Sequence, residues 1–139
     1  MVPFNKFNAW VVNIASGVNL PSDVCKLLLT NTLPVAANSL YGDISGTELA
    51  SGNGYTTGGA SITAPSYTQT GGLATFTGTV ASPTWTATGS MGPFRYVVAY
   101  DSTPSSKPLI GWWDYGSPLT LASPQTFTFT VNTGLFTLQ

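Results

Sequence analysis

Thr126-Phe127-Thr128-Phe129-Thr130-Val131 is the stretch that decides the fold class. Apolar residues alternate with threonines along it, and successive side chains of a β-strand point to opposite faces. One face of this segment is therefore apolar and the other polar, as expected of a strand with one buried face. Residues 73–80 show the same alternation, with Phe76 and Val80 on one side and threonines on the other. These two segments predict half-buried β-strands.

Similar segments recur along the whole chain. Phe94-Arg95-Tyr96-Val97-Val98-Ala99-Tyr100 is a strong example, rich in aromatic and β-branched residues. Glycines and prolines, 15 and 10 in number, lie between the segments as turn residues. The predicted strands cover residues 24–30, 60–63, 73–80, 83–88, 94–100, 109–113, 126–131 and 135–138. Short strands separated by turns predict a mainly β fold, either a β-sandwich of the jelly-roll kind or a barrel.

The first residues show helical spacing instead. The apolar positions three or four residues apart are Phe4, Phe7, Trp10, Val11, Ile14 and Val18. Asn5 is the expected N-cap and Gly17 the expected C-terminal stop, so we expect a short helix within residues 4–18. A strand through residues 10–12 is the alternative. Residues 39–49 are expected to hold a short strand or a helical turn.

The length of 139 residues suits one domain with a core of its own. We expect a single unit over residues 1–139, with an N-terminal helical segment (1–18) and a β core (22–139). Only 6% of the residues are charged and the net charge is -1, against about 25% charged in a typical domain. No basic patch for nucleic acid or for an anionic membrane surface is present in the sequence. So neutral a surface indicates either burial in an assembly or an uncharged coat.

Few residues could carry catalysis. Histidine is absent, which excludes Ser-His-Asp and Cys-His arrangements. Cys25 is the single cysteine and lies in an apolar run, so it is expected to be a small buried side chain. Asp101 and Asp114 are the best candidates for a pair of glycosidase carboxylates. The alternative is that they form turns or ion pairs with Arg95 or Lys107. We expect a protein that is not an enzyme.

Two further segments could bind ligands. Asp43 and Glu48 flank Gly46 and could hold Ca²⁺, but the spacing of an EF-hand is missing and Asp43 also suits a turn cap. Residues 52–59 are rich in glycine, but they lack both the phosphate-loop ending and the dinucleotide-binding spacing. Turns with positive φ explain these glycines better. We therefore expect no cofactor and no metal.

The aromatic run Gly111-Trp112-Trp113-Asp114-Tyr115-Gly116 is the most distinctive short motif. On a strand, Trp112 and Asp114 share one face, while Trp113 and Tyr115 share the other. One face could enter the core and leave aromatic side chains at the surface. Trp112, Trp113 and Tyr115, together with Tyr55, are the candidate interaction surface, either for a protein partner or for stacking on sugars. Burial of all of them in the core is the alternative.

The chain also resembles a family of small virion proteins of tailed bacteriophages, over nearly its whole length. The segments that carry the resemblance are Phe4-Asn5-Lys6-Phe7, Val18-Asn19-Leu20, Ser22-Asp23, Lys26-Leu27, Leu29-Thr30-Asn31-Thr32, Pro34-Val35-Ala36, Asp43-Ile44, Glu48-Leu49-Ala50, Gly52-Asn53-Gly54-Tyr55-Thr56, Gly92-Pro93-Phe94-Arg95-Tyr96 and Pro108-Leu109-Ile110-Gly111-Trp112-Trp113-Asp114-Tyr115-Gly116. The first segment departs from some relatives, because its expected helix lacks the usual acidic residues. These motifs are structural and include no catalytic signature.

The resemblance implies a structural protein of the phage particle, and small size with few charges suits a capsid decoration (cement) protein. Such proteins are mostly β, often resemble jelly rolls and are commonly trimeric. The expected partners are therefore the major capsid protein and further copies of this chain, on the exterior of the virion, with no nucleic acid and no membrane. A tail-fibre or other receptor-binding module that stacks glycans on residues 112–115 is the alternative.

Overall fold

The computed structural model describes residues 2–62, 65–78, 83–130 and 136–138. The prediction of a mainly β fold is confirmed, since 46% of the chain is strand and 11% is helix. The strands form open antiparallel sheets, so the barrel alternative is wrong. Within the described ranges, no helix is long and apolar enough to cross a bilayer.

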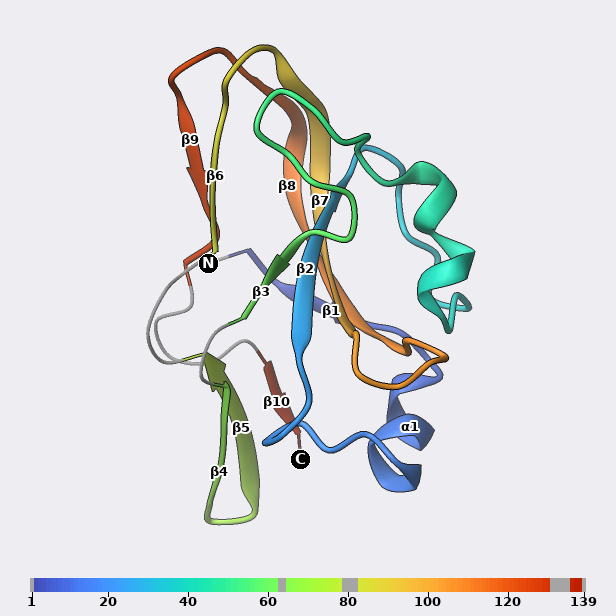
Figure 1. Cartoon of the computed structure of the whole chain (residues 1–139). Helices are drawn as coiled ribbons and strands as arrows, with labels where there is room; N and C mark the ends of the chain where they lie inside the picture. Colours follow the sequence, from blue (N-terminus) through green and yellow to red (C-terminus); the bar gives the residue numbers. More distant parts are fainter. Residues whose placement is uncertain (1, 63–64, 79–82, 131–135, 139) are drawn as a thin grey trace.

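A five-stranded antiparallel sheet organises the molecule (Figure 1). Its strand order is β1 (Phe4–Lys6), β8 (Leu109–Leu121), β7 (Met91–Asp101), β2 (Cys25–Thr30) and β3 (Ala60–Ser61). The long strands β7 and β8 come from the two strongest apolar segments in the second half of the chain. They pair from Met91↔Leu121 to Tyr100↔Leu109. The short strands β1 and β3 form the two edges of this sheet.

Two smaller sheets lie on one side of the five-stranded sheet (Figure 1). One has the order β10 (Phe136–Leu138), β5 (Leu73–Gly78) and β4 (Pro65–Thr70). The other pairs β6 (Thr84–Thr86) with β9 (Thr126–Thr128), and Trp85 faces Phe127 across it. On the other side lie the 3-10 turns η1 (Tyr41–Asp43) and η2 (Ser45–Thr47). Residues 39–49 are thus mainly helical turns, one of the two predicted outcomes.

Both faces of the five-stranded sheet are buried, which explains the unbroken apolar run at the start of the β core. Leu27 and Leu29 face one cluster and Leu28 faces the other. The first cluster joins the sheet to the small sheets through Phe76, Trp85, Phe127 and Phe129, among others. The second joins it to the 3-10 segment through Ile44 and Tyr41. A strand buried on both faces reads as a continuous apolar run rather than as an alternation.

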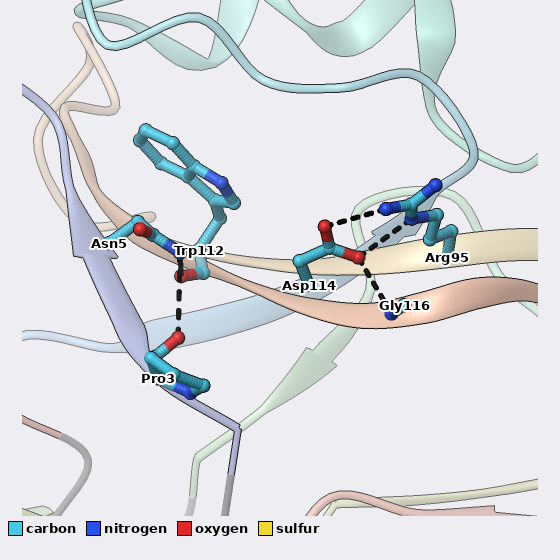
Figure 2. Close-up of polar contacts among 6 residues, drawn as sticks. All are labelled: Pro3, Asn5, Arg95, Trp112, Asp114 and Gly116. Atoms are coloured by element: carbon cyan, nitrogen blue, oxygen red, sulfur yellow. Dashed lines mark hydrogen bonds and ion pairs between the residues drawn. The ribbon is translucent and has the colours of Figure 1, made fainter.

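The start of the chain differs from the predicted helix. Residues Phe4–Lys6 form β1, and the helix α1 covers only Trp10–Ser16. The N-cap is Ala9, whereas the side chain of Asn5 donates to the carbonyl of Trp112 at 3.5 Å (Figure 2). Gly17 is confirmed as the C-cap, with φ 154°.

Two aromatic residues, Phe4 and Phe7, explain why the helical spacing of apolar residues wrongly predicted a helix at the start of the chain. The ring of Phe4 packs on Trp113 with centroids 5.2 Å apart, and that of Phe7 on Trp112 at 4.7 Å. Trp112 and Trp113 point to opposite faces of the sheet. Phe4 and Phe7, which pack on them, therefore also lie on opposite faces. A strand followed by a turn therefore produced the same three-residue spacing as a helix.

At the ends that the structure describes, the remaining predicted strands are confirmed within one to three residues, except that β8 extends eight residues beyond its predicted end, to Leu121. β4 was not predicted, because Pro65-Ser66-Tyr67-Thr68-Gln69-Thr70 has little apolar alternation. Five residues predicted at strand ends lie outside the described residues: Thr63, Thr79, Val80, Val131 and Leu135.

The glycine-rich segment is a turn whose backbone packs directly against the backbone of other segments. Gly54 has φ +100° and Gly59 has φ +73°. A Cβ on Gly54 would collide with the carbonyl of Thr86, and one on Gly59 with the carbonyl of Leu27. The preference for positive-φ turns over a phosphate loop is therefore supported by the backbone itself.

Candidate interaction surface

Three of the four predicted surface aromatics are core residues. Trp113 and Tyr55 are buried, and Trp112 is only 9% exposed. The prediction that these three residues form an interaction surface is wrong. Trp112 and Trp113 lie on β8, inside a sheet covered on both faces, and Tyr55 is buried with its hydroxyl bonded to Glu48 and to the amide of Leu29. Trp112 packs in the cluster beneath the 3-10 turns, while Trp113 packs in the cluster beneath the small sheets.

Tyr115 is the exception, since its side chain is half-buried. Its ring meets that of Phe127 edge-on at 5.3 Å, and burial raises the pKa of its hydroxyl. Of the four predicted residues, Tyr115 therefore keeps part of its side chain at the surface.

The exposed apolar side chains are aliphatic and lie elsewhere. Val11 and Val12 are on α1, and Leu33, Val35 and Leu40 are on the segment between β2 and η1. These five residues, which we call the apolar edge, are between 39% and 66% exposed. Single exposed apolar residues are common, and these five come from two segments of the chain that contact each other.

A hydrogen bond joins the two segments of the apolar edge. The amide of Asn8, just before α1, donates to the carbonyl of Ala36 at 2.9 Å. The end of α1 and Leu40 also line a cavity of about 180 Å³, whose walls include Asn13, Val18 and Pro108. The edge is therefore built on a fixed frame.

Asp43 supports this frame as a cap. Its Oδ2 accepts hydrogen bonds from the amides of Ser39 and Leu40 at 2.9 and 3.0 Å. These bonds hold the pKa of Asp43 below its usual value. The turn-cap interpretation of Asp43 is confirmed, and the cap fixes the backbone that presents Leu40.

Glu48 has different partners, so it does not join Asp43 in a calcium site. Its two carboxylate oxygens accept from the hydroxyls of Tyr41 and Tyr55, each at 2.6 Å, and from the amide of Gly58 at 2.6 Å. Tyr100 donates to the carbonyl of Gly58 at 2.7 Å. Burial and then Glu48 raise the pKa of Tyr41 and Tyr55, and burial raises that of Tyr100 to about 12. This network fastens the glycine-rich turn to the sheet.

The two candidate glycosidase carboxylates lie apart. Asp114 forms an ion pair with Arg95, as the alternative prediction held, and it also accepts from the amide of Gly116 at 2.7 Å (Figure 2). Asp101 is fully buried and pairs with Cys25 across β7 and β2. Asp101 shares the face of Ala99, whereas Asp114 shares that of Trp112, so the sheet separates them.

The remaining reactive groups do not form a site either. Burial, reinforced by Asp101 and Asp23, raises the pKa of the Cys25 thiol to about 12. Cys25 is buried, as expected of a structural thiol. Across the described ranges, no group of three or more His, Cys, Asp or Glu side chains could hold a metal ion.

Comparison with protein-family models, with curated proteins and with solved structures finds no match for this chain. The apolar edge must therefore be interpreted from its own chemistry. It offers exposed aliphatic side chains on a chain with few charged residues, and both properties suit contact with another protein surface.

Proposed function

We propose that this chain is a non-enzymatic structural protein of a tailed-phage particle, a capsid decoration (cement) protein that stabilises the head by protein–protein contacts. The observation that carries the proposal is the apolar edge on a chain with only 6% charged residues. The resemblance of the sequence to phage virion proteins supports a location in a phage particle. The apolar edge is the surface by which the chain would attach to it.

The chemistry of the edge favours a protein partner over a glycan. Sugars stack on flat aromatic faces, whereas the large exposed apolar residues in the described ranges are valines and leucines. The glycan-binding alternative depended on residues 112–115, of which Trp112 and Trp113 are buried and Tyr115 is half-buried. Aliphatic side chains suit apolar patches on a capsid subunit or on another copy of this chain.

The proposed action is mechanical. Complete burial of one valine or leucine contributes about 1.5–3 kcal/mol, so several residues of the edge would support a stable contact. Copies assembled as trimers would seat several edges at once, and each further contact would then form at high effective concentration. Repeated over a shell, such contacts would resist the pressure of packaged DNA.

The location is tested by immunogold labelling of purified virions. Labels spread over the head at high copy number support the cement role. Labels confined to the tail would contradict the cement role and would favour the receptor-binding alternative.

The surface is tested with purified protein and capsids that lack it. The double variant Val12→Lys/Val35→Lys places charges on both segments of the edge. We expect it to weaken sedimentation with capsids at least tenfold, without a change in Tm. Val24→Lys alters an exposed valine outside the edge and serves as the matched control. Equal binding by the double variant and the control would assign attachment to another surface.

A further inference from the structure

The strand β9 leaves one side of its backbone unpaired, on the side away from β6 (Figure 1). Between the two strands, the amide of Phe129 donates to the carbonyl of Pro83 at 2.9 Å, and the amide of Ala87 donates across the same pair at 2.8 Å. In an antiparallel pair, such positions alternate with positions whose backbone groups point outward. The N–H and C=O groups of Thr126 and Thr128 therefore point away from β6, and no described residue bonds to these backbone groups.

The opposite edge of this small sheet, on β6, is covered. The amide of Thr88 donates to the carbonyl of Asn53 at 3.0 Å. Gly54 packs so closely on the carbonyl of Thr86 that a Cβ on the glycine would collide with it. The glycine-rich turn thus closes the β6 edge, and a further strand can join this sheet only at β9.

Three other edge strands carry features that discourage pairing with another chain. β1 ends in the charged residue Lys6, β3 is only two residues long, and β4 begins with Pro65. Lysine, proline and short length are common protections of a sheet edge. Residues 125–130 contain neither a charge nor a proline, so the outer edge of β9 lacks both of these protections.

The surroundings of β9 are also uncharged. No Asp, Glu, Lys or Arg occurs between Glu48 and Arg95 or after Asp114. All strands of the two small sheets, namely β4, β5, β6, β9 and β10, lie in these stretches. A charged partner would find no complementary charge on these strands, whereas a second copy of the same sheet would meet no like charge. The charge distribution therefore favours a second copy over a charged protein.

The sequence of β9 is complementary to itself. Thr126-Phe127-Thr128-Phe129-Thr130 reads the same in both directions. Its threonines are exposed, while Phe127 and Phe129 face the core. If two copies pair antiparallel with Thr128 opposite Thr128, every threonine lies opposite a threonine and every phenylalanine opposite a phenylalanine. Cross-strand pairs of both kinds stabilise antiparallel strands.

We propose that the outer edge of β9 pairs antiparallel with β9 of a second copy, about a two-fold axis at Thr128. The two small sheets would then form one continuous sheet in the order β6–β9–β9–β6. Because the glycine-rich turn closes each β6 edge, the assembly ends at a dimer and does not grow into a fibre. The contact is independent of the proposed capsid role, since the apolar edge lies well apart from β9 (Figure 1).

The test is sedimentation of the purified chain at concentrations from about 1 μM to about 1 mM. The wild type should change from monomer to dimer as its concentration rises. Thr128→Lys places two like charges directly opposite each other, so we expect it to raise the Kd of the dimer at least about tenfold. Thr86→Lys adds the same charge to the exposed face of β6 and is the matched control. Its Kd should stay within about twofold of the wild type.

A mixture of two variants tests the position of the axis. Thr128→Lys and Thr128→Glu should each dimerise poorly alone, and an equimolar mixture should dimerise again. Only an axis at Thr128 brings this residue of one copy against the same residue of the other. Any trimer formed through other surfaces would persist in both variants, so its loss or survival does not affect this result.

Hydrogen exchange tests the edge in the wild type without a mutation, and decides the matter if the variants do not fold. The amides of Thr126 and Thr128 should exchange more slowly as the concentration rises, whereas the Phe129 amide, paired within the chain, should not change.

Three outcomes would overturn the proposal. A wild type that stays monomeric at every concentration would exclude the dimer. Equal effects of Thr128→Lys and Thr86→Lys on the Kd, or exchange of the Thr128 amide that is independent of concentration, would assign the contact to another surface. Protection of this amide only when capsids are added would assign the edge to a strand of a capsid subunit.

Discussion

Arg95 and Asp114 form a bidentate ion pair across β7 and β8. Arg95 Nε lies 2.7 Å from Asp114 Oδ1, and Arg95 Nη2 lies 2.9 Å from Oδ2 (Figure 2). The register of β7 against β8 shifts between Phe94 and Tyr96, and this irregularity lets Arg95 reach Asp114. The guanidinium also lies 5.2 Å from the ring centroid of Tyr96. The pair therefore fixes an irregular part of the sheet.

Loss of this pair should destabilise the protein only slightly. Both side chains are 34% exposed, and water and salt screen ion pairs at such positions. We expect Arg95→Ala and Asp114→Asn each to lower Tm by no more than about 5 °C, and by less in high salt. Arg95 holds the pKa of Asp114 below its usual 3.8, so this stabilisation is present above that pH and is lost as the pH falls further. A double-mutant cycle measured by thermal unfolding in low and high salt checks the prediction, and a salt-independent coupling would contradict it.

The sequence predicted the roles of single polar residues better than it predicted which residues other parts of the fold would cover. The ion pair of Asp114 with Arg95 and the turn cap at Asp43 were each one of the predicted roles of these residues, and both are confirmed. The surface role of Trp112 and Trp113 failed, because strand period tells which side chains share a face but not what covers that face. Both faces of β8 are covered, one by the small sheets and the other by the 3-10 turns.

The apolar edge could not be predicted from the sequence, because the exposure of its residues also depends on what covers them in the fold. Val11 and Val12 follow Trp10 in one apolar run, and only Trp10 is buried. The seven-residue α1 is too short for its apolar face to be recognised by period. The exposure of Leu33 and Val35 depends on the path of a loop between distant segments, which no local pattern encodes.

The Tyr55 hydroxyl should contribute more to stability than any exposed polar group. It donates to Glu48 Oε1 at 2.6 Å and accepts from the amide of Leu29 at 3.1 Å. Tyr55→Phe leaves the buried Leu29 amide without this acceptor and removes a hydrogen bond to a charged group. We expect a loss of about 1.5–3 kcal/mol in the free energy of unfolding, measured by urea denaturation.

Tyr67→Phe on β4 provides the matched control for Tyr55→Phe. Tyr67 is half-buried and lies outside the Glu48 network, so loss of its hydroxyl should change stability by less than about 0.5 kcal/mol. Equal effects of the two substitutions would show that the Glu48 network does not fasten the glycine-rich turn.

Alkaline pH should weaken the fold through Tyr100. Burial, reinforced by Glu48, raises the pKa of Tyr100 from 10.0 to about 12. The unfolded chain loses this proton first, so the stabilisation is present below pH 10.0 and is lost as the pH rises through about 12. In Tyr100→Phe the fall in Tm over this range should be smaller than in the wild type. Identical slopes would mean that the Tyr100 hydroxyl ionises equally easily in both states.

Gly59 should be the least replaceable glycine of the turn that carries Tyr55. Its φ of +73° disfavours any side chain, and an added Cβ would collide with the backbone of Leu27 in the buried strand β2. Because backbone cannot yield as a flexible side chain can, we expect Gly59→Ala to cost at least about 3 kcal/mol or to prevent folding. Gly42→Ala is the control, since a Cβ there meets nothing within 4 Å, and it should change stability by less than about 0.5 kcal/mol. A soluble, fully stable Gly59→Ala protein in a thermal melt would contradict the close contact between the glycine-rich turn and β2.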